Sequence, residues 1–325
     1  MLTQPTGTDQ ESTSMTEAHS CVAITGATGF AGRHIMPKLL MGGHRVRALV
    51  RSRKRLTAAS GNTHTIEGDI FDDRCVEQLV DGADTVIHLI GIIDENPMNG
   101  ITFENLHVNA TTRLLQAAKD AGVSRWVHMS ALGARPNAVA NYHKTKWEAE
   151  QAVRDSGLDW TIIRPSIIHG PDGEFMKLIK TWWTSFFNPP LIVPYFGAGP
   201  FGAGGSGHLQ PVWVDDVAQC FVDALTNPRT IGETYPMGGP ERYTFPELYA
   251  AVRDRLPKTR CKMIVPMPAW KAKILGRLPG MPFNWDQVVM SQEDSICDTS
   301  KVEHDFGIKL AGFTEKLDEY AANIG

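Results

Sequence analysis

The feature that most constrains this chain is a glycine-rich run near its amino end, T-G-A-T-G-F-A-G over residues 25–32. It follows the apolar residues 21–24 and opens a helix-like stretch that reaches Met41. A strand, a glycine turn and a helix in this order form a phosphate cradle, because backbone N–H groups and the helix dipole converge where no Cβ blocks approach. We therefore predict that this turn holds a dinucleotide. The residues expected to contact it are Gly26, Thr28, Gly29, Phe30 and Gly32.

The spacing of these glycines is G-x-x-G-x-x-G, one residue longer in its first gap than the standard dehydrogenase fingerprint. On its own such a run also fits an ordinary chain turn. The prediction of a dinucleotide site therefore needs support from residues farther along the chain.

Length and composition narrow the class of protein. With 325 residues, 42% of them hydrophobic and 21% charged, the chain is long enough for one large α/β core and a smaller appended region. A formal net charge of -4 gives no general attraction to nucleic acid, so we expect no nucleic-acid partner. Its five cysteines are scattered without a C-x-x-C pair, which predicts neither disulfides nor a metal site and favours a cytoplasmic setting.

Apolar, β-branched runs alternate with helical stretches through the first half of the chain. We expect strands at residues 21–24, 46–50, 63–67, 85–90, 126–129 and 160–163, and such alternation predicts parallel βαβ units. The expected fold is α/β, a Rossmann-type doubly wound parallel sheet with a smaller C-terminal substrate lobe. We assign 1–18 to a disordered leader, 19–170 to the dinucleotide-binding domain, and 171–325 to a mixed segment that completes the sheet and forms the lobe.

The second predicted strand is followed by basic residues where an NAD-selective protein usually carries an acid. Arg51, Arg53 and Lys54 lie in the run R-S-R-K-R. Guanidinium and ammonium groups pair with a ribose 2'-phosphate, whereas a carboxylate would repel it. We therefore expect NADP(H) to be preferred over NAD(H). The alternative is a solvated basic turn.

Other cofactor contacts are expected at the ends of the next two strands. Asp69 can accept a hydrogen bond from the adenine amino group while Ile70 packs on the ring, although Asp69 or Asp72 also fits the N-cap of the next helix. Leu89 and Gly91 follow the fourth strand, where the glycine lets the backbone approach the cofactor.

Candidate catalytic residues follow the fifth strand. Ser130 ends this strand, and Tyr142 and Lys146 are four residues apart, which places phenol and ammonium on one face of a helix. A nearby ammonium and an oxidised nicotinamide would both lower the phenol pKa, so that Tyr142 becomes an acid or base near neutrality. Ser130 would then bond the substrate oxygen.

These residues resemble the short-chain dehydrogenase/reductase superfamily in its extended or atypical form, related to NAD-dependent epimerases and dehydratases. Asn109 matches a helix asparagine of that family, R-P-x-x-x-x-G-P at 164–171 matches its turn, and V-D-D-V-A at 214–218 matches its late segment. The resemblance implies that Asn109 supports Lys146 and that Pro165 borders the cofactor. The chain departs from the family at Trp213, where His is common.

Within the superfamily, S-A-L-G-A at 130–134 and D-Q-V at 286–288 are similar to the branch of the NADPH-binding accessory subunit of respiratory complex I. That resemblance implies tight, structural nucleotide binding. It leaves two functions: an oxidoreductase or epimerase/dehydratase that uses Tyr142 and Lys146, or a non-catalytic NADP(H)-binding accessory protein of a respiratory or lipid-linked assembly. A redox-sensing regulator is disfavoured because the tyrosine and lysine are intact.

Two segments bear on the substrate and partner. The aromatic run at 182–187 lines a pocket for an apolar or quinone-like substrate, forms a contact with a membrane or a respiratory complex, or is core. Residues 270–278 form a short basic amphipathic stretch, which suits the inner face of a membrane but also an ordinary surface helix. Substrate identity and oligomeric state are left open by the sequence.

Overall fold

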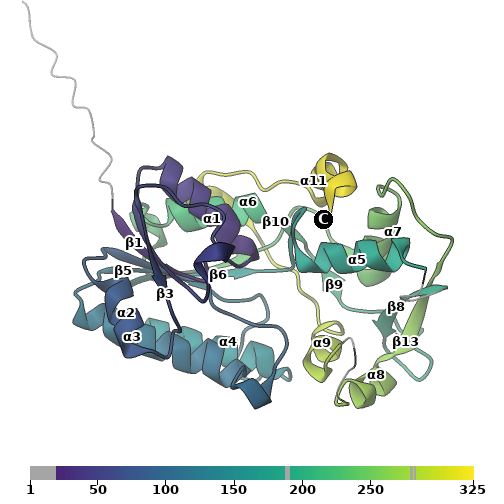
Figure 1. Ribbon diagram of the computed structural model, residues 1–325. Helices are drawn as coiled ribbons and strands as arrows, with labels where there is room; N and C mark the ends of the chain where they lie inside the picture. Colours follow the sequence, from purple (N-terminus) through teal and green to yellow (C-terminus); the bar gives the residue numbers. More distant parts are fainter. Residues whose placement is uncertain (1–19, 187–190, 279–280, 282) are drawn as a thin grey trace, which may run out of the picture.

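The computed structural model describes residues 20–186, 191–278, 281 and 283–325, so the predicted leader at 1–18 lies outside the described residues (Figure 1). A seven-stranded sheet of order β11-β6-β5-β4-β1-β2-β3 forms its centre, and every neighbouring pair is parallel. Its strands are β1 (Cys21–Thr25), β2 (Arg45–Val50), β3 (Thr63–Glu67), β4 (Thr85–His88), β5 (Arg125–Met129), β6 (Asp159–Pro165) and β11 (Glu233–Met237).

Helices cover both faces of this sheet, which is why its inner strands are apolar throughout. On one face α1 (Phe30–Met41) and α6 (Val214–Asp223) pack side by side. The other face carries α2 (Asp73–Val80), α3 (Ala110–Asp120) and α4 (Asn141–Arg154). Ile24 in β1 is fully buried and pairs with Ala48 on one side and Ile87 on the other.

The predicted Rossmann-type sheet is confirmed, and β1 is its switch point. Successive strands run outward from β1 through β2 to β3, and then the chain returns to the opposite side of β1 to form β4, β5 and β6. In doubly wound sheets ligands bind outside the carboxyl ends of the strands at such a point. The glycine run directly follows β1, so it lies at this edge.

The six predicted strands match β1 to β6. β4 ends at His88 instead of residue 90. The Leu89 N–H makes the last bond to β1, at the Thr25 carbonyl. Pro37 lies inside α1, and the helix continues past it to Met41.

The rest of the chain adds strand β11 to the sheet and builds a lobe beside it (Figure 1). The lobe has three short strand pairs, β7 (Ile168–His169) with β10 (Val212–Trp213), β9 (His208–Leu209) with β12 (Tyr243–Thr244), and β8 (Ile192–Gly197) with β13 (Met263–Pro268). Its helices are α5 (Glu174–Thr184), α7 (Phe245–Arg253), α8 (Ala269–Leu275), α9 (Trp285–Met290) and α11 (Phe313–Tyr320), while α10 (Ser300–Phe306) packs beside β11. Among the described residues, no helix combines the length and apolar character that a bilayer crossing needs.

Candidate functional site

The glycine turn after β1 has the shape that phosphate binding needs. Gly26 has a φ of +74°, and a Cβ on Gly32 would lie 2.3 Å from the Gly26 carbonyl oxygen. Gly29 is the N-cap of α1, and no side chain bonds the helix there. The helix amino end therefore presents backbone to the crevice, and only glycine permits this close path.

Phe30 lies beside the glycine turn and connects it to the second half of the chain. Its ring atoms lie about 3 Å from where a Cβ would stand on Gly170 or Gly173. Gly170 belongs to the R-P-x-x-x-x-G-P run, so this run supplies space for the ring.

Residues at the ends of the neighbouring strands lie close to the glycine turn. Leu89 after β4 faces Gly26, with its Cβ 3.0 Å from the position of a Gly26 Cβ. Ile70 is buried, and the carboxylate of exposed Asp69 accepts the Phe71 N–H at 3.0 Å. The N-cap of α2 is Asp72, which decides between the two aspartates for that role.

The basic run after β2 is exposed. Arg51 and Lys54 form no ion pair with any residue that the structure describes, and Arg53 lies 3.5 Å from the Glu67 carboxylate with 65% of its side chain accessible. These cations stand at the carboxyl end of β2, next to the strand that carries the glycine turn.

Lys146 is buried next to Gly91, which follows β4. Its Nζ donates to the Met129 carbonyl at 3.1 Å, and a Cβ on Gly91 would lie 2.8 Å from the same nitrogen. A glycine at 91 therefore leaves room for this amine. Burial lowers the pKa of Lys146 to about 8, against the attraction of Glu150, which opposes the loss of charge.

Tyr142, one helical turn before Lys146, is held by aromatic rings. Its ring meets Phe103 and His107 edge to face at centroid distances of 5.8 and 5.4 Å, and its hydroxyl bonds no other residue in the described part of the chain. Burial raises the pKa of Tyr142 to about 12. The expected lowering of this pKa by Lys146 is absent from the protein alone, where burial is the cause of the shift.

His107 is the residue of this site that the sequence did not indicate. It is buried, accepts the Ile92 N–H on Nε2 at 3.2 Å, and therefore donates from Nδ1 to Thr145 Oγ1 at 2.8 Å. Burial, reinforced by Lys146, lowers its pKa to about 2, so the ring is neutral. The neutral His107 ring, held by these two hydrogen bonds, packs edge to face against the Tyr142 ring.

Asn109 does not occupy the place predicted for it. Its side chain is exposed and donates to Asn105 Oδ1 at 3.0 Å, on its own helical segment. The segment Glu104–Asn109 is π-helical, which changes the angular position of each residue along it and brings His107 inward. Asn109 therefore makes no direct bond to Lys146 within the described residues, and its expected support of Lys146, through the local structure or water, stays a prediction.

Ser130 also differs from the expectation. Its buried hydroxyl donates to Glu150, a fully buried carboxylate that Arg164 holds at 2.7 Å and Arg154 at 2.9 Å. The hydroxyl proton is bonded to this ion-pair network, so in this conformation Ser130 does not donate it to a substrate. Arg164 of the R-P-x-x-x-x-G-P run serves the same network, and Pro165 ends β6, where its carbonyl accepts the Leu132 N–H.

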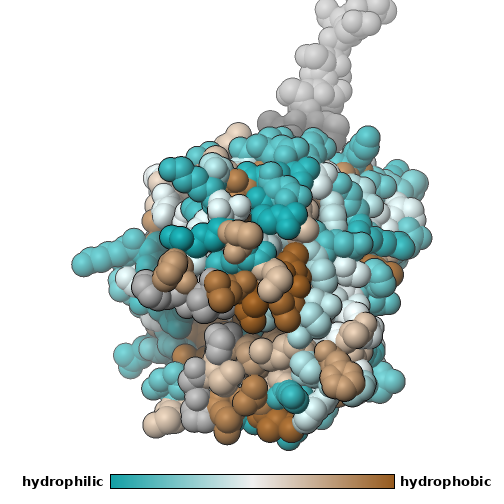
Figure 2. All heavy atoms as spheres, turned by 90° about the vertical axis from the view of Figure 1, so that its right-hand side faces the viewer, coloured by the Kyte–Doolittle hydropathy of each residue, from teal (hydrophilic) through white to brown (hydrophobic). Residues whose placement is uncertain are grey.

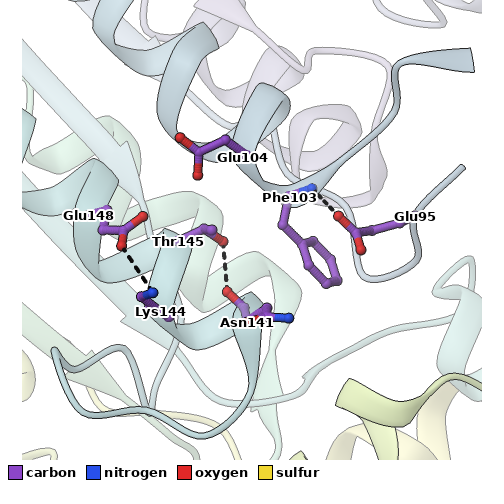
Figure 3. Close-up of a pocket in the computed structure, with 7 residues that line it drawn as sticks. All are labelled: Glu95, Phe103, Glu104, Asn141, Lys144, Thr145 and Glu148. Carbon is purple, nitrogen blue, oxygen red and sulfur yellow. Dashed lines mark hydrogen bonds and ion pairs between the residues drawn. The ribbon is translucent and has the colours of Figure 1, made fainter. Parts of the chain in front are cut away.

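A cavity of about 260 Å³ opens between α4 and the π-helical segment (Figure 3). Three carboxylates face one ammonium there, which does not suit a polyanionic dinucleotide. None of its lining residues belongs to the glycine turn. They are Glu95, Phe103, Glu104, Asn141, Lys144, Thr145 and Glu148.

The aromatic run is largely core. Trp183 is fully buried and donates its indole N–H to the Tyr249 carbonyl at 3.0 Å, while Trp182 packs edge to face on the Tyr249 ring. Phe186 is exposed, and Phe187 lies outside the described residues. Core packing therefore accounts for both tryptophans.

Comparisons with known proteins agree with this geometry. A family model described as NAD(P)H-binding matches residues 26–179. The chain is 32% identical over 269 residues to NADH dehydrogenase [ubiquinone] 1 alpha subcomplex subunit 9, mitochondrial, of Rattus norvegicus, covering 80% of this chain and 67% of that one. It is also 35% identical over 167 residues to the ceramide reductase of Caulobacter vibrioides, covering 51% of this chain and 52% of that one.

Among solved structures, the UDP-glucuronic acid 4-epimerase from Bacillus cereus in complex with UDP-glucuronic acid and NAD superimposes with a TM-score of 0.72. The match covers 94% of this chain and 98% of that one at 18% identity, so it speaks for the fold. The sheet, the glycine turn and these similarities lead to one assignment. The chain belongs to the short-chain dehydrogenase/reductase superfamily in its extended or atypical, epimerase-like form, on the branch related to the nucleotide-binding accessory subunit of respiratory complex I.

Proposed function

We propose that this protein is an NADP(H)-dependent oxidoreductase that reduces a carbonyl compound, with Tyr142 as the proton donor. The observation that carries the proposal is the buried Lys146 amine, held against Met129 O one helical turn from Tyr142. Burying an ammonium is costly, and a chain tends to retain one where it has a task. Gly91 leaves room for it at the edge where the cofactor would lie.

The residues present fit a nicotinamide dinucleotide. The glycine turn and the uncapped start of α1 would bind the pyrophosphate, and Asp69 with Ile70 would border the adenine. Lys146 would donate to the ribose next to the nicotinamide ring. When bound, the reduced nicotinamide supplies the hydride that reaches the carbonyl carbon.

The proton must come from the protein. Because the pKa of Tyr142 is raised to about 12, its phenol is protonated at neutral pH and can donate to the carbonyl oxygen as that oxygen gains charge. The resulting phenolate would be reprotonated from solvent. A neutral phenol can donate a proton but is not ready to accept one, so it suits reduction of a carbonyl rather than oxidation of an alcohol.

Selectivity for NADP(H) is part of the proposal. Arg51 and Lys54 are exposed cations at the end of β2 and have no ion-pair partner in the described part of the chain. Unpaired cations are available for a 2'-phosphate. Arg53, which lies near Glu67, would contribute less.

The substrate that we propose is a carbonyl compound with apolar substituents, either a lipid-like ketone or a quinone. Two curated relatives are named reductases, the ceramide reductase of Caulobacter vibrioides and the (4-alkanoyl-5-oxo-2,5-dihydrofuran-3-yl)methyl phosphate reductase of Streptomyces griseus. The first name denotes a lipid substrate, and the second denotes a substrate with an alkanoyl group.

A second function has an observation of its own. The Ser130 hydroxyl, which was expected to orient a substrate beside Tyr142, donates its proton to Glu150 in this conformation. The relatives named as subunits of NADH dehydrogenase are components of a larger assembly. A nucleotide-binding accessory protein that keeps its NADP(H) without turnover fits both facts.

One experiment separates the two functions. The purified protein is titrated with NADPH, and the absorbance of the reduced cofactor is followed with long-chain ketones, quinones and, as a polar control, nucleotide sugars. Turnover that Tyr142→Phe lowers at least about a hundredfold, with NADPH affinity retained, supports the reductase. Bound NADPH that no substrate oxidises supports the accessory protein, and absence of nucleotide binding contradicts both.

A further inference from the structure

One end of the lobe exposes several large apolar side chains around α8. Trp270 and Ile274 are one turn apart on this helix and are 51% and 57% accessible, and Leu278 beyond its end is 55% accessible. The Trp270 indole N–H donates to the Pro200 carbonyl at 3.2 Å, which brings the loop with the 82% accessible Phe201 alongside. We call Phe201, Trp270, Ile274, Leu275 and Leu278 the α8 patch.

Figure 2 shows brown side chains gathered across the middle and lower part of this face, at the height of β8, β13 and α8 in Figure 1. Single exposed apolar residues are normal on a protein surface, whereas a contiguous group marks a contact site. Leu191, just before β8, accepts the backbone N–H of Met263 in β13, and both exposed side chains extend the apolar surface along the same lobe.

The charge of this lobe is the second observation. Residues 255–285 hold seven arginines and lysines and no aspartate or glutamate, within a chain whose net charge is -4. No acidic residue occurs at 175–214 either. These two segments of the lobe together carry nine basic and no acidic side chains, while the remainder of the chain is anionic. Such an asymmetry selects a partner of opposite charge at one end of the molecule.

Some of these cations stand at the edge of the α8 patch. Lys271 is exposed and lies 5.3 Å from the centroid of the Trp270 ring, Lys273 is half-buried on the same helix, and Arg277 lies over the Trp285 ring. An apolar centre with an aromatic side chain and a basic rim is the pattern of a helix that lies in a lipid headgroup layer.

We propose that the α8 patch docks this protein on the surface of a bilayer that contains anionic lipid. Trp270, Ile274 and Leu278 enter the headgroup region, while Lys271, Lys273 and Arg277 contact lipid phosphates. This inference goes beyond the proposed reductase, because it needs no catalytic turnover. It places the protein at a membrane surface through an attachment that requires no spanning helix.

The test is co-sedimentation of the full chain with vesicles of phosphatidylcholine alone or mixed with phosphatidylglycerol. We expect binding to the mixed vesicles only, and its weakening by added salt. Each basic side chain near such a surface adds to the attraction, so the double variant Lys271→Glu/Lys273→Glu should lower partitioning by about tenfold or more. Ile274→Glu, which removes apolar insertion without removing a cation, should also weaken it.

The matched control is Lys119→Glu/Lys309→Glu, which makes the same change in net charge at two exposed lysines outside the lobe. It should bind vesicles nearly as the parent does, and NADPH titration checks that every variant is folded. Equal loss in the control, or no binding of the parent to anionic vesicles, overturns the proposal. A self-association that Ile274→Glu abolishes, with no vesicle binding, would instead make this face an interface between copies of the chain.

Discussion

Lys146 directs its amine at the carbonyl oxygen of Met129, 3.1 Å away, from a position that is only 3% exposed. The amine of the Y-x-x-x-K pair thus lies inside the protein before any ligand arrives. Burial lowers the pKa of this amine to about 8, so the free energy of unfolding depends on pH through Lys146.

Replacing Lys146 with methionine should change how stability depends on pH. Between about pH 8 and 10.5 the unfolded chain holds a proton on this lysine that the folded chain has released, so stability of the parent rises with pH relative to Lys146→Met. Urea unfolding of both proteins across this range measures the difference. At neutral pH the variant should be at least as stable, with weaker NADPH binding. Parallel pH profiles would contradict the burial of the charge.

Arg51→Asp should weaken NADPH more than NADH. The substitution replaces an unpaired cation at the end of β2 by a carboxylate, which repels a 2'-phosphate but accepts a bond from a 2'-hydroxyl. Isothermal titration with both cofactors measures the ratio of their dissociation constants, which should change by about tenfold or more. Lys119→Asp makes the same charge change in α3, on another part of the molecule, and should leave the ratio unchanged. Equal loss of both cofactors in Arg51→Asp would refute the 2'-phosphate role.

Ser130→Ala should behave as a structural variant. Its hydroxyl bonds the buried Glu150 carboxylate, so removing it should lower the free energy of unfolding by about 1 to 2 kcal/mol. Glu150 keeps its two arginines, and cofactor affinity should be retained. In a reductase, turnover should fall less than tenfold, well below the loss expected for Tyr142→Phe. A loss of turnover as large as that of Tyr142→Phe, with unchanged stability, would show instead that Ser130 bonds the substrate.

A fourth prediction concerns His34, which connects α1 to two carboxylates. Its Nε2 lies 3.0 Å from Asp172 and its Nδ1 2.8 Å from Asp215. Burial alone would lower the pKa of His34, but the bonds to Asp215 and Asp172 outweigh it and raise that pKa, while the same bonds lower the pKa of Asp215.

The raised pKa of His34 stabilises the fold below the ordinary histidine pKa of about 6.5, and the contribution disappears as pH rises through the folded value. The lowered pKa of Asp215 stabilises the fold above the ordinary aspartate pKa, and this contribution disappears as the pH falls through the folded value. His34→Gln should therefore cost about 1 kcal/mol near pH 6 and less near pH 9. Thermal unfolding at both pH values measures this, and a cost that grows with pH would contradict it.

The sequence was a good guide to the sheet because each strand is a local pattern. Apolar runs separated by helices predicted β1 to β6, and the glycines of the turn could be assigned because only glycine fits Gly26 at positive φ and Gly32 against the Gly26 carbonyl. The end of β4 was placed two residues late, since Leu89 and Ile90 are as apolar as the strand they follow.

The site was harder to predict because its partners are brought together by packing. Ser130 and Glu150 are twenty residues apart, and only the docking of α4 on β5 brings them together. Asn109 carries a family pattern, but the π-helical segment changes which side chains point inward, a shift that residue types do not reveal. The pKa of Tyr142 depends on burial among rings of the π-helical segment and its N-cap, which lie more than thirty residues away in the sequence.

The seventh strand of the sheet has a consequence for synthesis of the chain. β6 pairs with β11, whose residues are translated nearly seventy positions later. Until then one backbone edge of β6 has no neighbour, and open strand edges invite pairing with other chains. A fragment that stops at residue 170 should therefore aggregate, and a nascent chain needs protection until the ribosome has delivered β11.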